Sequence, residues 1–320
     1  MKKFILLFLA ILLALVINEL FVRYIIQYPI WGVKNKIIGI RSSENGIQNE
    51  YFPYSKYWNV ESGNKVFLRN NLGFWGIDVD TNINSKYIIV LGSSYIEAQQ
   101  VPPEASAVSI FFAKIKKNNL NYQVINLGYS GHDPYDSYLR ILYYEKYYHP
   151  SIVLLVLNSN NIKWLNRHSY PFNFKVNDNF GKKQSGIKLR SMKLLRNHLS
   201  SFNLIANYIL GGNGNDAKKI EQGNEYFYQG VLNAQNLVKL FDCLTVYQKK
   251  YSNNFVCVSV DSNLKSNRLI ENWCKDNKVN FVHSENIEVP KNLLHGSGHF
   301  NQAGNLQLGN YLYDTFIEFY

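Results

Sequence analysis

The chain has 320 residues, of which 46% are hydrophobic and 18% are charged. This composition excludes wholesale disorder, and the length fits one large α/β domain with a membrane segment and an insertion better than two full domains. Lys and Arg outnumber Asp and Glu by 34 to 23, and the resulting net charge of +11 favours anionic partners such as membrane headgroups or acidic glycans. The basic residues are scattered and no nucleic-acid-binding module is recognisable, so we expect no nucleic-acid partner.

The N-terminus has the pattern of a membrane-targeting segment. Two lysines precede an apolar run, Phe4–Val22, that is broken only by Asn18 and Glu19. Because no small-x-small cleavage site follows, we predict an uncleaved signal anchor over residues 1–23. The N-terminus would then be cytoplasmic, and the main domain would lie in the periplasm or at the cell surface. A cleaved signal peptide is the competing interpretation.

The next segment, residues 24–85, is rich in Tyr, Asn and Gly and has few periodic stretches, so we expect an irregular, membrane-proximal arm. From residue 86 onward, buried-strand and helix patterns alternate. The expected strands are 87–91, 122–127, 151–157, 253–260 and 279–282. The expected helices are 105–117, 133–147, 225–250, 263–276 and 302–319. Alternation of helices with strands that are apolar throughout predicts a three-layer, flavodoxin-like α/β/α domain over residues 86–320, built on a mostly parallel five-stranded sheet.

One stretch, residues 162–222, interrupts this alternation. It is polar and basic and contains a glycine-rich run. We predict an insertion with one or two helices, which could serve as a lid.

The sequence offers no cofactor or metal motif. Gly92 stands alone after the first strand, where a dinucleotide site needs Gly-x-Gly-x-x-Gly. His295 and His299 are four residues apart, but the glycines between them indicate a loop rather than the helix of a zinc-ligand pair. The three cysteines have no metal or disulfide spacing, and the apolar neighbours of Cys257 indicate a buried thiol on a strand.

Polar residues follow three of the expected strands and precede the last helix. Gly92–Ser94 follows the first strand, Asn126–Gly131 the second and Asn158–Asn161 the third, and Gly296–Asn301 precedes the final helix. The carboxyl ends of parallel strands share one edge of the sheet, where ligands bind. Acyl transfer needs an exposed serine, a histidine that takes its proton, and hydrogen-bond donors for the oxyanion. Residues of these types occur in the four segments.

The order of these four segments resembles the sequence blocks of the SGNH (GDSL-type) hydrolase and esterase family, in its membrane-anchored bacterial form. Val90–Ala98 is similar to the first block of that family, and Arg69–Gly76 resembles a segment that precedes it in anchored members. The match spans residues 86–161 and 253–318.

The resemblance assigns roles to four residues. It implies that Ser94 is the nucleophile and His299 the base. It further implies an oxyanion hole formed by the backbone N–H groups of Ser94 and Gly131 and the side chain of Asn160. Asn161 competes with Asn160 for the third-block position, and we favour Asn160. Purely structural roles compete as well, since Ser94 could cap the following helix and Gly131 could only permit a turn.

Three carboxylates of the family pattern are absent. Ser93 stands where the first block has Asp, and Asn161 stands where the third block has Asp. Gly296 occupies the position of the acid that orients the imidazole. The expected site is therefore a Ser-His dyad in which a backbone carbonyl holds the ring N–H, unless another acid such as Glu285 or Glu288 replaces the missing one.

The resemblance implies an exported esterase or acyltransferase that acts without a cofactor on ester-linked acyl groups, acetyl foremost, of a cell-envelope glycan or a small ester. The basic, Tyr-rich composition suits acidic sugars and stacking on pyranose rings. The alternative is a catalytically degenerate domain that binds glycan or scaffolds an envelope assembly through protein partners. A lipid-acting esterase with an apolar cleft beneath residues 162–222 is a third interpretation.

Overall fold

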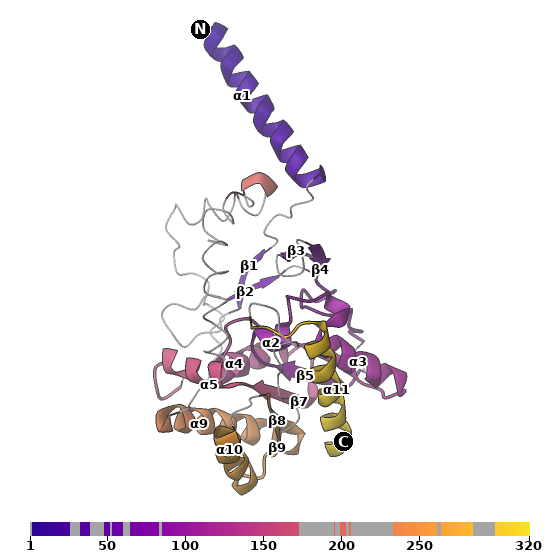
Figure 1. Cartoon of the computed structure of the whole chain (residues 1–320), viewed down its shortest axis with the longest axis vertical. Coiled ribbons are helices and arrows are strands. Elements are labelled where there is room, and N and C mark those ends of the chain that lie inside the picture. Colours follow the sequence, from indigo (N-terminus) through magenta and orange to yellow (C-terminus); the bar gives the residue numbers. More distant parts are fainter. Residues whose placement is uncertain are drawn as a thin grey trace.

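The centre of the molecule is a sheet of five parallel strands in the order β6-β5-β7-β8-β9 (Figure 1). The strands are β5 (Tyr87–Leu91), β6 (Gln123–Asn126), β7 (Pro150–Leu157), β8 (Phe255–Ser259) and β9 (Asn280–His283). The computed structural model describes residues 2–25, 33–38, 48–51, 53–59, 65–82, 85–172, 195, 199–202, 205, 233–260, 264–283 and 298–320, with only the backbone for 33–38, 48–50, 58 and 264–266. The predicted α/β fold with a five-stranded parallel sheet is confirmed, and each strand begins and ends within two residues of its predicted bounds.

Helices cover both faces of this sheet, which explains why the strands are apolar throughout. On β5, Ile89 and Leu91 belong to one hydrophobic cluster, and Ile88 and Val90 belong to the other. The first cluster is completed by α4 (Pro134–Tyr144), α9 (Ala234–Tyr251) and α10 (Leu264–Asp276), and the second by α3 (Ala107–Lys117) and α11 (Gln302–Phe319). The cysteine prediction is confirmed, because Cys257 is a buried free thiol on β8.

Two short helices begin at the carboxyl edge of the sheet. They are α2 (Ser94–Glu97) and α5 (Ser159–Lys163), which follow β5 and β7. A 3₁₀ turn, η3 (Trp164–Arg167), continues directly from α5. Of the predicted insertion at 162–222, the structure describes only 162–172, 195, 199–202 and 205, so its predicted role as a lid lies outside the described residues.

The arm at 24–85 is not irregular as expected. Two antiparallel pairs lie within it, β1 (Val33–Ile38) with β2 (Gln48–Tyr51) and β3 (Lys56–Asn59) with β4 (Lys65–Leu68). With at most six residues each, these strands are too short for a clear alternating pattern in the sequence. Beyond them, Trp75 is buried against Ala98 and Val101, which packs the arm on the segment after α2.

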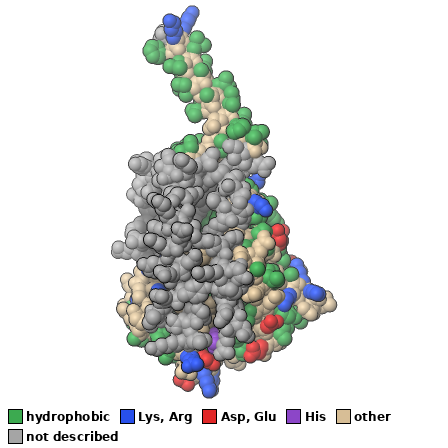
Figure 2. All heavy atoms as spheres, in the orientation of Figure 1, with side chains coloured by type: hydrophobic (Ala, Val, Ile, Leu, Met, Phe, Trp, Pro, Cys, Tyr) green, Lys and Arg blue, Asp and Glu red, His purple; other side chains and the backbone are tan. Residues whose placement is uncertain are grey.

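The chain begins with helix α1 (Lys2–Leu20), which continues as a π-helical turn to Ile25. It projects away from the sheet (Figure 1) and carries hydrophobic side chains along its length, with basic side chains at its free end (Figure 2). Within the described residues it is the one helix with the length and apolar composition of a membrane span, and a signal sequence shares these features. At its end, Glu19 pairs with Arg23 at 2.9 Å and accepts the N–H groups of Ser200 and Ser201.

Candidate active site

Ser94 and His299 lie in contact although 205 residues separate them. Nε2 of His299 is 3.0 Å from Oγ of Ser94, which is the contact that a base needs to activate a serine. Ser94 is the first residue of α2 and is half-buried, at the carboxyl edge of the sheet. The helix cap at this position is Ser93, so a capping role does not account for Ser94.

Hydrogen bonds hold the chain on both sides of His299. The hydroxyl of Tyr95 donates to the carbonyl of Gly298 at 3.1 Å, and the side-chain amide of Gln100 donates to the carbonyl of Phe300 at 3.0 Å. The rings of Tyr95 and Phe300 also pack edge to face. Because Tyr95 and Gln100 belong to the segment that presents the nucleophile, that segment also positions the base.

The start of α11 fixes the same loop from the other side. Asn301 caps the helix by accepting the N–H of Gly304 at 3.0 Å. Asn305, which is fully buried, donates to the carbonyl of Phe300 and accepts the N–H of Ala107 at the start of α3. The final helix and α3 are therefore tied to the histidine loop.

The residues expected to orient the imidazole of His299 belong to the segment before it. Gly296 and the candidate replacement acids Glu285 and Glu288 lie outside the described residues. The Ser-His dyad stays a prediction.

Gly131 lies in a tight turn after β6. The N–H of His132 donates to the carbonyl of Tyr129 at 3.0 Å, and Gly131 has a φ of +82°. Positive φ at the third residue alone is typical of a type II turn. A Cβ atom at this position would meet nothing within 4 Å. The backbone therefore requires glycine here, while the space beside it is open.

The turn after β7 separates the two asparagine candidates. Asn158 and Asn161 cap α5 reciprocally, each accepting the backbone N–H of the other at 2.9 Å. Asn161 also donates to the carbonyl of Val156 at 3.4 Å, a bond that a carboxylate could not make. The side-chain amide of Asn161 is therefore used to stabilise the turn. The side chain of Asn160, which is half-buried, takes no part in this cap.

Ser93 joins two of the predicted blocks. Its hydroxyl accepts a hydrogen bond from the side-chain amide of Asn158 at 3.3 Å. Both groups are neutral, and both are buried between the ends of β5 and β7. The hydroxyl of Ser93, at the position where the resemblance expects a carboxylate, therefore links the first and third predicted blocks.

Sequence reasoning missed a buried acid, Glu97, beside the predicted oxyanion turn. Its carboxylate accepts both the N–H and the hydroxyl of Ser130, each at 2.6 Å. Arg69 lies 3.8 Å from the same carboxylate, with its guanidinium 3.4 Å above the ring of Tyr51. The sequence did contain a sign of this buried acid, because Glu97 stands between the apolar residues Ile96 and Ala98.

Hydrogen bonds of Asn126 connect the turn after β6 to α2 and to the arm. Its amide donates to the carbonyls of Trp75 and Ile96 at 2.9 and 2.8 Å, and its oxygen accepts the N–H of Gly128. A Cβ atom on Gly128 would lie only 2.5 Å from the backbone nitrogen of Glu97, so glycine permits this close approach. The turn that carries Gly131 is thereby packed directly on the helix that carries the nucleophile.

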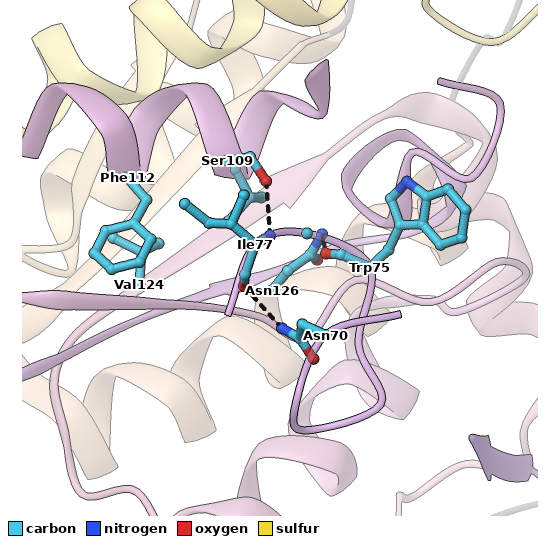
Figure 3. A pocket seen from close by; sticks show the side chains of 9 residues that line it. Asn70, Trp75, Ile77, Ser109, Phe112, Val124 and Asn126 are labelled. Carbon is cyan, nitrogen blue, oxygen red and sulfur yellow. Dashed lines mark hydrogen bonds between the residues drawn. The ribbon is translucent and has the colours of Figure 1, made fainter. Parts of the chain in front are cut away.

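A small pocket lies beside this junction (Figure 3). It is lined by Asn70, Trp75, Gly76, Ile77, Val108, Ser109, Phe112, Val124 and Asn126. The backbone of Ile77 donates to the hydroxyl of Ser109, and its carbonyl accepts from the amide of Asn70. Neither the serine nor the histidine of the site lines it, so it belongs to the packing of the arm against β6.

A charged cluster surrounds the start of α4. Asp133 caps the helix and lies 2.5 Å from Nε2 of His168. Burial disfavours the charged form of His168, but hydrogen bonds and charges of Asp133 and Asp136 outweigh it and raise its pKa to about 9. Burial, followed by the charge of Asp133, raises the pKa of Asp136. Asp133, Asp136 and His168 lie close enough together to hold a cation. Both carboxylates, however, already pair with His168 and with Arg167.

No family model matches the chain, and no curated protein matches its sequence. Similar solved structures include TesA, with 12% identity and a TM-score of 0.46 over 73% of this chain and 100% of that chain. The psychrotrophic esterase EstA from Pseudoalteromonas sp. has 13% identity and a TM-score of 0.43 over 73% of this chain and 98% of that chain. The acetyl xylan esterase AlAXEase has 14% identity and a TM-score of 0.39 over 71% of this chain and 98% of that chain. These likenesses are distant.

Proposed function

We propose that this chain is an exported, membrane-anchored serine esterase or acyltransferase that acts on ester-linked acyl groups, with acetyl the expected group, of a cell-envelope glycan. The observation that carries the proposal is the 3.0 Å contact between His299 and Ser94 at the carboxyl edge of a parallel sheet. The turns that carry Gly131 and Asn160 follow the two strands on either side of β5.

In the proposed reaction, Nε2 of His299 takes the proton of Ser94 while Oγ attacks the acyl carbon. The backbone N–H groups of Ser94 and Gly131 and the amide of Asn160 stabilise the oxyanion. The alcohol leaves with the proton from His299, and the acyl group remains on Ser94. Water then releases the acid in an esterase, or a hydroxyl of an acceptor takes the acyl group in a transferase.

The charge and composition of the chain support a glycan substrate. A net charge of +11 attracts acidic polymers, and a Tyr-rich composition suits stacking of aromatic rings on sugars. The apolar helix α1 supports location at a membrane.

A degenerate binding domain is the second candidate, because three expected carboxylates are absent. Two of the replacements, Ser93 and Asn161, have structural partners of their own. Gly296 is the replacement that bears on catalysis, because loss of the orienting acid costs about 10⁴-fold when nothing compensates.

The test uses the full chain in detergent with p-nitrophenyl acetate and an acetylated oligosaccharide. We expect turnover by the wild type and a loss of at least about 10³-fold in Ser94→Ala, because the nucleophile is removed. Ser169→Ala, an exposed serine outside the site, is the matched control and should keep wild-type turnover. Background rates in the wild type together with glycan binding by Ser94→Ala would favour the binding domain instead. Turnover that survives in Ser94→Ala would place the chemistry elsewhere.

A further inference from the structure

Charged side chains hold the turn that carries Gly131 at both ends. On one side, Glu97 accepts the backbone N–H and the hydroxyl of Ser130. On the other side, the guanidinium of Arg167 donates to the carbonyl of Gly131 at 2.7 Å. The peptide group between Ser130 and Gly131, which bears the proposed oxyanion N–H, lies between these two charge-assisted hydrogen bonds.

Arg167 is itself held in place although its side chain is 46% exposed. Its Nε donates to the carbonyl of Trp164 at 3.2 Å, and its guanidinium lies 4.9 Å from the centre of the Trp164 ring. Asp133 and Asp136 lie 3.4 and 3.8 Å from the same guanidinium. The planar group is therefore fixed by a ring, a carbonyl and two carboxylates.

The position of Arg167 in the chain links it to the other proposed donor. It ends η3, which continues without a break from α5, the helix that contains Asn160. Lys239 of α9 fixes the same segment, since its ammonium donates to the carbonyls of Leu165 and His168 at 3.3 and 3.4 Å. The contact between Arg167 and Gly131 thus joins the turn after β7 to the turn after β6.

We propose that Arg167 is a positioning residue for acyl transfer, because it sets the spacing between the oxyanion donors carried by Gly131 and Asn160. This role rests on the proposed function. Oxyanion donors act at about 2.7–3.1 Å from the oxyanion, and a displacement of about 1 Å can cost about 10²-fold in rate. Because the oxyanion exists only in the transition state, loss of Arg167 should lower kcat and leave KM nearly unchanged.

The test compares Arg167→Met with Arg167→Lys in the full chain in detergent. Met should lower kcat about 10–100-fold with KM within about threefold of wild type. Lys should recover part of kcat, because an ammonium can still donate to the carbonyl of Gly131. Arg268→Met, at an exposed arginine of α10, is the control and should match wild type. Exchange of the His132 amide, which closes the turn, should be faster in Arg167→Met alone.

The outcomes separate this role from the proposed function. Ser94-dependent turnover in the wild type with kcat of Arg167→Met within about threefold overturns the positioning role and leaves the function standing. A raised KM at unchanged kcat, or a lower melting temperature at unchanged kcat, overturns it as well. Absence of Ser94-dependent turnover in the wild type removes the function, and the role of Arg167 falls with it. Should Arg167→Met not fold, Arg167→Ala, which also lacks a donor, replaces it under the same criteria.

Discussion

Two glycines in the same loop are required for different reasons. Gly131 has a φ of +82° with open space beside it, whereas Gly128 is pressed against the backbone of Glu97. A side chain at the first position would strain the backbone, and a side chain at the second would collide with α2. Substitution by alanine therefore separates the orientation of a donor from the packing of the loop.

We expect Gly131→Ala to lower kcat by about 10²–10³-fold, because a residue with a Cβ favours a type I turn in which the central N–H points the opposite way. Its free energy of unfolding should fall by only about 1–2 kcal/mol, the cost of left-handed backbone for a residue with a Cβ. The measurements are steady-state kinetics and urea unfolding of the full chain in detergent. Full activity in this variant would show that the N–H of Gly131 is not an oxyanion donor.

Gly128→Ala is the comparison. A Cβ atom there would lie 2.5 Å from the nitrogen of Glu97 and 2.6 Å from Cγ2 of Ile96, so the backbone must move. Overpacking of this kind costs about 1–3 kcal/mol of stability. We expect Gly128→Ala to lose at least as much stability as Gly131→Ala, with activity lost through displacement of α2.

At the scale of elements, the sequence predicted the sheet and the meeting of Ser94 with His299. Continuous apolar runs predicted the strands, and the rule that parallel strands share a carboxyl edge placed the polar segments together. The pairing of Ser94 with His299 was implied by the resemblance of these segments to known sequence blocks. The roles of Glu97 and Arg167 could not be predicted in this way. Their partners lie on other elements, and only the placement of side chains across the loops brings them together.

The charged cluster at α4 joins this helix to the end of η3 and gives a prediction about pH. The pKa of His168 is raised from 6.5 to about 9. A raised pKa in the folded state stabilises fully below about pH 6.5, and this stabilisation is lost as the pH rises to about 9. The groups that face it are Asp133 and Asp136 of α4, with Arg167 beside the same carboxylates. His132 is also near, and burial, then Arg140 and its other cationic neighbours, keeps its pKa low.

We expect the free energy of unfolding of the wild type to exceed that of His168→Gln by on the order of 2–3 kcal/mol below pH 6.5. The difference should shrink between about pH 6.5 and pH 9, because the neutral imidazole loses its ion pair with Asp133. Urea unfolding of both proteins across this pH range measures the difference. Because all other titrating groups are common to both proteins, their contributions cancel in that difference. Parallel curves for the two proteins would contradict a charged His168 in the folded state.

At the scale of the whole molecule, the N-terminal arm packs against the candidate site. The ring of Tyr51 on β2 stacks with Tyr129 of the turn that carries Gly131 at 6.3 Å and lies beneath the guanidinium of Arg69. Arg69 in turn faces Glu97, which binds Ser130. The segment between the apolar helix and the sheet thus supports the turn that carries the proposed donor.

The cysteines of the chain make its membrane topology measurable. All three are fully buried, so a thiol reagent should leave them unmodified in the folded protein. Lys275→Cys would place an exposed thiol on α10, and Lys3→Cys would place one at the free end of α1.

If α1 is an uncleaved anchor with a cytoplasmic N-terminus, a membrane-impermeant maleimide on intact cells should label Lys275→Cys alone. Lys3→Cys should be labelled only after the membrane is opened, and the mass of the labelled chain should include α1. A cleaved signal peptide would yield a shorter chain that lacks the Lys3→Cys label under both conditions, and labelling of Lys3→Cys alone on intact cells would reverse the proposed orientation.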